Sequence, residues 1–409
     1  MVVGVLAASL GYSLKIITEF FEEFLIEEIN HFPILYFITP TVGIVLIYLF
    51  RKYFFRSKKN KGIKEIFRTL EHRKDELPFY KVPSHYINGF FTVIFGGSTG
   101  IEVSTVVATA ALGASIHKKE SVANRYKTEL VCGGVAAGIT VLFGSPVAGF
   151  LFAVEVISRK TTRTIILSCF ISVLIAWLFV FFSDDRPIFD FQISHYNFQA
   201  IPFIILLSLL AGIVAVYFTK SVIFIKQEFE AFNNKFVRVI VGAFLVGILV
   251  FLFPELYGDS YHALSHFTSL TNQNNLDLGT MMQLSLLVFL KPLAASLTLG
   301  AGGDGGVFAP SIVTGAFLGI LVSLISNHFF NTDLIVLNFA IIGAAAMLSA
   351  AIHAPLTALF LACNIVGHGY ILFIPILIGV FIAKKCAQIL CDYTVYTYRR
   401  KKQPFSFNQ

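Results

Sequence analysis

The residue with the clearest chemical potential is a glutamate that follows a glycine-rich break in otherwise apolar sequence. Glu102 comes shortly after the run Gly96-Gly97-Ser98-Thr99-Gly100, and apolar residues resume beyond it. Glycines let the backbone turn tightly and present N–H groups, and the positive end of the following helix favours an anion at the same place. We predict that Glu102 occupies this anion site and leaves it when protonated. The alternative is that its carboxylate only caps the helix.

A second glycine-rich break precedes Pro310 and reads G-A-G-G-D-G-G-V-F-A-P from Gly300. It contains the pattern G-x-G-x-x-G, but a membrane-length apolar run precedes it instead of a strand, and no acidic residue follows at the required distance. A dinucleotide site is therefore excluded. We expect the backbone N–H groups of Val307 and Phe308 to face an anion here.

The amino-acid composition indicates whether these breaks lie in water or in a membrane. Of 409 residues, 56% are hydrophobic and 13% are charged, with a mean hydropathy of +0.77. Soluble chains carry about 25% charged residues. We therefore predict an all-α polytopic membrane protein of about a dozen helices, at ~20 residues per span. The five cysteines show neither zinc nor disulfide spacing and are expected to be packing residues.

The charge distribution predicts the orientation in the membrane. The segment Arg51–Lys81 has eleven Lys or Arg and four Asp or Glu, whereas Glu19–Glu28 has five Glu and no Lys or Arg. Basic loops stay on the cytoplasmic side. We expect a multi-pass integral protein of a bacterial inner membrane, with its basic loops and its C-terminus in the cytoplasm. The net charge of +7 is thus a sign of orientation, and no nucleic-acid partner is expected.

Helices are the elements that would position the two breaks. Apolar runs of helical length cover these ranges: Val2–Phe24, Phe32–Phe50, Leu130–Ile157, Ile165–Phe182, Ile201–Ile225, Val237–Phe253, Met281–Leu299, Phe308–Ser326, Leu334–Ile352 and Tyr370–Leu390. Shorter runs cover Tyr86–Phe95, Ser104–Ile116 and Pro355–Val366. Short segments broken by Gly or Pro are typical of half-helices that meet inside a bilayer.

An internal repeat supports this interpretation. The segment 134–155 aligns without gaps on the segment 343–364, with a proline at the same place in each copy and Glu155 opposite Asn364. A glycine-rich break lies upstream of each copy. We predict duplicated halves on the logic of inverted repeats; the alternative is chance similarity between helices rich in small residues.

Taken in order, these motifs resemble those of the CLC chloride channel and transporter family, from Val3 to Tyr398. Gly100-Ile101-Glu102 is similar to the family's gating-glutamate motif in its Gly and its Glu, and Gly302–Ser311 is close to G-G-S-G-G-x-F-x-P-S. Phe143–Phe152 resembles F-x-A-P-x-x-G-x-L-F. Tyr393–Thr397 is similar to the stretch that carries the anion-coordinating tyrosine.

The resemblance implies a CLC-type inverted-repeat bundle with half-helices that meet at a mid-membrane anion site. It implies a homodimer with one pore in each subunit, in which a gating glutamate, here Glu102, competes with the anion. The anion would be held by backbone amides of Gly100, Ile101, Val307 and Phe308 and by the Tyr396 hydroxyl. The ligand would be chloride or a similar small anion, and no cofactor or metal is expected.

Residues 1–409 are expected to form a single transmembrane domain with halves 1–190 and 191–398. A cytoplasmic regulatory domain is not expected, because the chain ends soon after the tyrosine stretch. An enzyme would need a nucleophile with a base or a metal cluster. The sequence has no recognisable spacing for either, so we do not expect an enzyme.

One departure from the family lies in the loop expected to coordinate the anion. That loop corresponds to Asn60–Lys64, and the family's serine position is Lys61, followed by Gly62. Either the Lys61 ammonium contributes to the anion site, or Lys61 is a solvated cytoplasmic residue. The choice between chloride, nitrate and fluoride stays open for this reason.

A second departure concerns protons. Exchangers of the family usually carry two adjacent glutamates after the L-F motif, and here the pair is Glu155-Val156. Val156 cannot carry a proton, and Glu155 would point ~100° away around the helix. This favours a passive anion channel over a proton-coupled chloride or fluoride exchanger, unless Glu155 or a chain of waters carries the proton. A membrane protein without transport activity is the distant third hypothesis.

Overall fold

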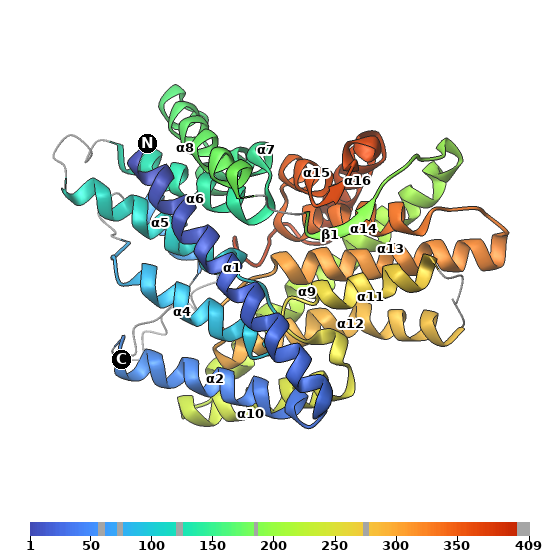
Figure 1. Ribbon diagram of the computed structural model, residues 1–409, viewed down its shortest axis with the longest axis horizontal. Helices are drawn as coiled ribbons and strands as arrows, with labels where there is room; N and C mark the ends of the chain where they lie inside the picture. The colour runs from blue at the N-terminus through green and yellow to red at the C-terminus, as the bar shows by residue number, and fades with distance from the viewer. Residues whose placement is uncertain (56–61, 72–76, 120–125, 184–186, 273–277, 399–409) are drawn as a thin grey trace, which may run out of the picture.

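The computed structural model describes residues 1–55, 62–71, 77–119, 126–183, 187–272 and 278–398. Within these ranges, 8 helices are long and apolar enough to cross a membrane. The molecule is a bundle of helices that cross one another at many angles (Figure 1). The chain is thus an all-α polytopic membrane protein, as its composition predicts.

In the first half the described elements are α1 (Val2–His31), α2 (Leu35–Tyr53), α3 (Ile63–Glu71), α4 (Lys81–Ile94), α5 (Glu102–Lys119), α6 (Lys127–Phe143), α7 (Pro146–Leu151), the π-helical turn η2 (Phe152–Ser158), α8 (Arg163–Phe182) and β1 (Phe189–Gln192). In the second half they are η3 (Phe198–Ala200), α9 (Ile201–Ala231), α10 (Lys235–Leu252), η4 (Pro254–Leu256), α11 (Tyr261–Asn272), α12 (Leu278–Ala301), α13 (Phe308–Phe330), α14 (Val336–Ile352), α15 (Pro355–Asn364), β2 (Val366–Gly367), η5 (Gly369–Leu372) and α16 (Phe373–Leu390).

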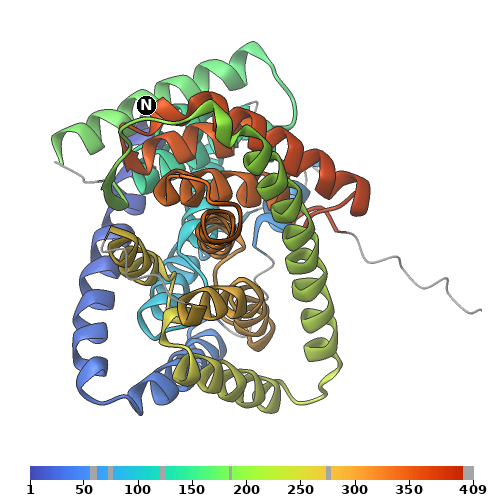
Figure 2. The same ribbon diagram turned by 90° about the vertical axis from the view of Figure 1, so that its right-hand side faces the viewer.

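The helix α13 forms the centre of the molecule. Its most apolar stretch is 94% buried, against neighbours that include α12 and α14. The peripheral helix α8 is even more apolar, yet only 28% of its most apolar stretch is buried. A helix that is apolar all round must face either protein or lipid. In Figure 2, α13 lies inside the bundle and α8 lies on its outer edge.

The range Leu130–Ile157, expected as one helix, is instead broken in the middle. The helix α6 ends at Phe143, and Gly144 takes a left-handed conformation with φ +59°. Ser145 then accepts a hydrogen bond from the Ala148 N–H (3.4 Å), and α7 begins at Pro146. Glycine after a helix, followed by a serine cap and a proline in the first turn, is the usual chemistry of a helix break.

The two copies of the predicted repeat contact each other reciprocally. The helices α7 and α15 lie side by side (Figure 1). Glu155 accepts hydrogen bonds from the Thr357 N–H (3.0 Å) and hydroxyl (2.8 Å) in the first turn of α15. Asn364, its counterpart in the alignment, donates to the Ser145 hydroxyl at the start of α7 (3.0 Å). This reciprocity supports the proposed duplication.

Two described helices have no counterpart among the expected elements. The helix α3 is short and amphipathic, and α11 has only 12 residues of mixed polarity. Neither contains a membrane-length apolar run, so hydropathy gives no signal for them. The parallel pair of β1 and β2 joins Phe189 to Val366 and ties the end of the first half to the second.

Candidate anion-binding and gating site

The two glycine-rich breaks lie against each other and bring together the first turns of α5 and α13. The Thr99 hydroxyl donates to the Asp304 carbonyl (3.3 Å), and the Ser98 N–H donates to the Thr298 hydroxyl (3.1 Å). The Asp304 N–H in turn donates to the Thr92 hydroxyl (2.9 Å). These bonds satisfy buried loop groups that cannot reach water, and they join segments distant in the sequence.

The contact between the breaks is possible because glycines line it. Gly305 has φ +144°, and a Cβ there would lie 2.4 Å from the Thr99 side chain. A Cβ on Gly306 would lie 2.1 Å from Val103 on α5. Both distances are below any real Cβ contact, so side chains at these positions would push the two helix ends apart.

Glu102 is the first residue of α5, and its side chain is buried between the ends of two helices. It is 4% exposed, and its Oε1 accepts a hydrogen bond from the Tyr261 hydroxyl (3.2 Å). Its Oε2 has no hydrogen-bond partner among the described residues. The carboxylate faces the backbone N–H of Ala309, in the first turn of α13. A negative group is thus held where helix ends favour an anion, a position compatible with both roles considered for Glu102.

Tyr396 approaches the same place from the C-terminal segment. The residue is 8% exposed, and its hydroxyl has no hydrogen-bond partner in the described part of the chain. The hydroxyl faces the Val307 N–H at the start of α13 and lies close to Gly306. A buried free hydroxyl beside a helix-terminal N–H supplies two donors, which is what a small anion requires.

Two cavities border the first turn of α5, and we name them outer and inner after the orientation that the charge distribution predicts. The outer cavity, of about 430 Å³, is bordered by Ile101, Glu102 and Tyr261. The inner cavity, of about 360 Å³, is bordered by Val103, Val307 and Tyr396. Since consecutive residues of α5 border different cavities, the first turn of α5 separates the two spaces.

The two cavities differ in charge. The outer cavity carries mostly acidic groups: Glu19, Glu22, Glu23 and Asp259, with Lys15 and His262. The inner cavity carries mostly basic groups: Arg51, Lys64, Lys226 and Arg238, with Glu230 and Asp304. Lys64 lies on α3, outside the spanning helices, and burial lowers its pKa while Glu230 opposes that shift. A basic cavity raises the local concentration of anions.

The remaining expected anion-site residues are placed as follows. Gly100 lies directly against the Glu102 carboxylate, because a Cβ there would meet Oε2 at 2.3 Å. Phe308 is fully buried, and its ring packs edge-on against Phe152 with 5.3 Å between centroids. Gly62 borders the inner cavity. Lys61 lies outside the described residues, so neither hypothesis for its ammonium is tested.

The expected proton-path residues lie elsewhere. Glu155 is half-buried and bound to the first turn of α15, and Val156 is 4% exposed. Neither residue borders the outer or the inner cavity. In the described structure the Glu155 carboxylate caps the first turn of α15, and its role in a proton path stays a prediction.

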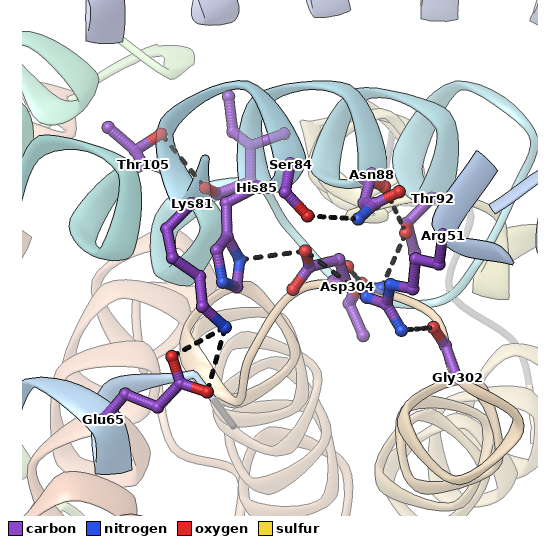
Figure 3. Close-up of polar contacts among 12 residues, drawn as sticks. Arg51, Glu65, Lys81, Ser84, His85, Asn88, Thr92, Thr105, Gly302 and Asp304 are labelled. Carbon is purple, nitrogen blue, oxygen red and sulfur yellow. Dashed lines mark hydrogen bonds and ion pairs between the residues drawn. The ribbon is translucent and has the colours of Figure 1, made fainter. Parts of the chain in front are cut away.

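Four polar residues near the site were missed in the sequence. Tyr261 comes from the unexpected helix α11, and Asp304 forms an ion pair with His85 (2.9 Å) and with Arg51 (3.5 Å). Figure 3 shows Asp304 between His85 and Arg51. Asp304 replaces a serine of the family motif, which is the one signal that could have drawn attention to it. Its partners come from α4 and α2 and have no sequence signal.

Comparison with known proteins agrees with this geometry. The model of the voltage gated chloride channel family matches residues 42–388, and the chain belongs to this CLC family. It is 26% identical over 379 residues to the H(+)/Cl(-) exchange transporters ClcA of Salmonella arizonae and Salmonella newport, covering 89% of this chain and 78% of theirs.

Solved structures share the fold. A slow cyanobacterial Cl-/H+ antiporter aligns with a TM-score of 0.81 and 20% identity, and a CLC-type fluoride/proton antiporter with 0.75 and 23%. Each alignment covers 97% of this chain and 95% of the other. The chain is therefore a multi-pass integral membrane protein with a CLC fold.

Proposed function

We propose that this protein exchanges protons for chloride or a similar small anion, with Glu102 as the group that both gates the anion and carries the proton. The observation that carries this proposal is that the Glu102 carboxylate borders the outer cavity while Val103, the next residue of α5, borders the inner cavity. The relatives named as proton/chloride exchangers support the exchanger over the passive channel that Val156 favours.

The mechanism follows from competition for one positive site. The ionised Glu102 carboxylate lies against the ends of α5 and α13, where it excludes an anion. Protonation removes its charge and with it most of that attraction, so the side chain leaves and an anion enters. The anion would then be bound by backbone N–H groups of the two breaks and by the Tyr396 hydroxyl. Return of the carboxylate expels the anion and releases the proton.

The test is transport by the purified protein in liposomes with an outward chloride gradient and a pH electrode outside. We expect protons to move against their own gradient, because each chloride that leaves drives a proton inward. In Glu102→Gln we expect chloride to flow without proton movement, since the amide cannot carry a proton. Glu129→Gln on α6, which borders neither cavity, is the matched control.

A passive anion channel is the second candidate, and the aliphatic Val156 is the observation in its favour. The same experiment decides between the two. Chloride flux from the unmodified protein with no uphill proton movement would establish the channel and reject the exchanger.

A further inference from the structure

A buried ion pair lies beside the second glycine-rich break, away from Glu102. His85 on α4 is 0% exposed, and its Nδ1 lies 2.9 Å from the Asp304 Oδ2. Asp304 is itself 5% exposed, and Arg51 Nη2 lies 3.5 Å from the same oxygen. Burying such groups is costly unless they are paired, so the pair must be held by the surrounding structure.

One ring nitrogen of His85 faces the carboxylate and the other does not. His85 Nδ1 lies 2.9 Å from Asp304 Oδ2, whereas Nε2 has neither a hydrogen-bond nor an ion-pair partner among the described residues. A buried imidazole beside a carboxylate has the chemical groups needed to pass a proton.

One member of the pair, Asp304, opens to the inner cavity. Asp304 borders the inner cavity, together with Tyr396 and with Val103, the residue after Glu102. Water in this cavity could therefore connect Asp304 with the first turn of α5. Proton transfer through water needs such a shared space, and the predicted proton-path residues Glu155 and Val156 do not border it.

The pair lies among other charged side chains: Arg51 on α2, Glu65 on α3, Lys81 on α4, Lys226 on α9 and Arg238 on α10. Lys81 lies one turn before His85 on α4 and is bound to Glu65 at 2.7 Å. Figure 3 shows this second pair below His85. The groups around the pair are thus mostly cationic, and the one carboxylate among them, Glu65, is already paired with Lys81.

We propose that the His85–Asp304 pair is the inner proton-exchange site of this protein, in place of the position occupied by Val156. This inference rests on the proposed exchanger function. A proton passes from water on the side of the basic loops to the pair, then through water in the inner cavity to the first turn of α5, and from there to the Glu102 carboxylate in the same turn. Each step moves one proton from donor to acceptor and returns the donor to its starting form.

The decisive variant is His85→Gln, assayed in liposomes with chloride flux and proton flux recorded together. Glutamine can still donate a hydrogen bond to Asp304 but cannot carry a proton. We expect the number of protons moved per chloride to fall by about tenfold or more, the order seen when a proton-transfer group is removed. Asp304→Asn should have the same effect, and Glu129→Gln serves as the control.

The outcomes separate this inference from the exchanger proposal. If the unmodified protein moves no protons uphill, the exchanger proposal fails. If it does, and His85→Gln keeps the same ratio of protons to chloride, the inference is overturned. It is also overturned if Glu155→Gln removes coupling while His85→Gln retains it. Loss of all chloride flux in His85→Gln would contradict a proton-carrying role and indicate a structural one, which makes this variant decisive even if Asp304→Asn does not fold.

Discussion

Tyr261 is the one side chain that donates a hydrogen bond to the Glu102 carboxylate in the described structure. A hydroxyl that donates to a carboxylate stabilises its charged form over its protonated form. In the proposed mechanism Tyr261 therefore favours the closed gate, and its effect should appear in the pH dependence of transport.

We predict that Tyr261→Phe shifts the midpoint of acid-activated anion flux to higher pH. Removing a hydrogen bond to a charged group costs roughly 1.5 kcal/mol, equal to about one pH unit. The bond favours the ionised Glu102, so without it the carboxylate takes up a proton more readily and flux rises at a higher pH. The measurement is chloride efflux from liposomes between acid and neutral pH. Tyr217→Phe, whose hydroxyl bonds a carbonyl far from the cavities, is the control. An unmoved midpoint in Tyr261→Phe would show that the hydroxyl does not hold the gate.

We predict that Tyr396→Phe weakens anion binding without unfolding the protein. The hydroxyl is buried and has no partner in the described chain, so its removal breaks no internal bond. One neutral hydrogen bond to the anion is worth about 1 kcal/mol, or roughly fivefold in affinity. Calorimetric titration with chloride measures this. Tyr393→Phe, which does not border the inner cavity, should bind as the unmodified protein does. Equal affinity in Tyr396→Phe would remove Tyr396 from the anion site.

At the scale of elements, the short helices α7 and α15 stabilise each other through their ends. Glu155 satisfies two donors in the first turn of α15, which a helix leaves without intrahelical partners. The acceptor, rather than the charge, is what these donors require. This explains why a glutamate can stand here although it borders neither cavity.

We predict that Glu155→Ala lowers the free energy of unfolding by about 2 kcal/mol, because it leaves the Thr357 N–H and hydroxyl unsatisfied. Glu155→Gln should cost less, since the amide oxygen still accepts a hydrogen bond. The measurement is the thermal unfolding midpoint in detergent. Equal destabilisation by alanine and glutamine would mean that the charge matters and that Glu155 has a role beyond capping.

At the scale of the whole molecule, the charges that line the two cavities and the apolar side chains of the outer surface lie on different parts of the fold. The acidic groups of the outer cavity lie mainly on α1, and the basic groups of the inner cavity lie on α2, α3, α9 and α10. The lipid-facing helices expose large apolar side chains, such as Leu167 and Phe182 on α8. Such surfaces are covered in a membrane by lipid or by another protein. The homodimer that the family resemblance implies stays a prediction.

Sequence alone determined the class of protein and the two glycine-rich breaks to which its chemistry is assigned. A charged fraction of 13% cannot belong to an ordinary soluble domain, and the two glycine-rich breaks are local signals read directly from residue order. The prediction that Glu102 lies in the first turn of a helix is confirmed, because helix starts depend on neighbouring residues. The break at Pro146 had the same kind of signal, yet the apolar run across it was read as one helix.

Tertiary structure alone decided which distant side chains meet. Tyr261 reaches Glu102 from a helix that hydropathy does not detect, and His85 reaches Asp304 across more than half of the chain. The hydrogen bonds of Glu155 to Thr357 on α15 were not visible in the sequence for the same reason. Spacing along the chain encodes helix faces and turns, whereas a contact between separate helices depends on how they pack, which no local pattern specifies.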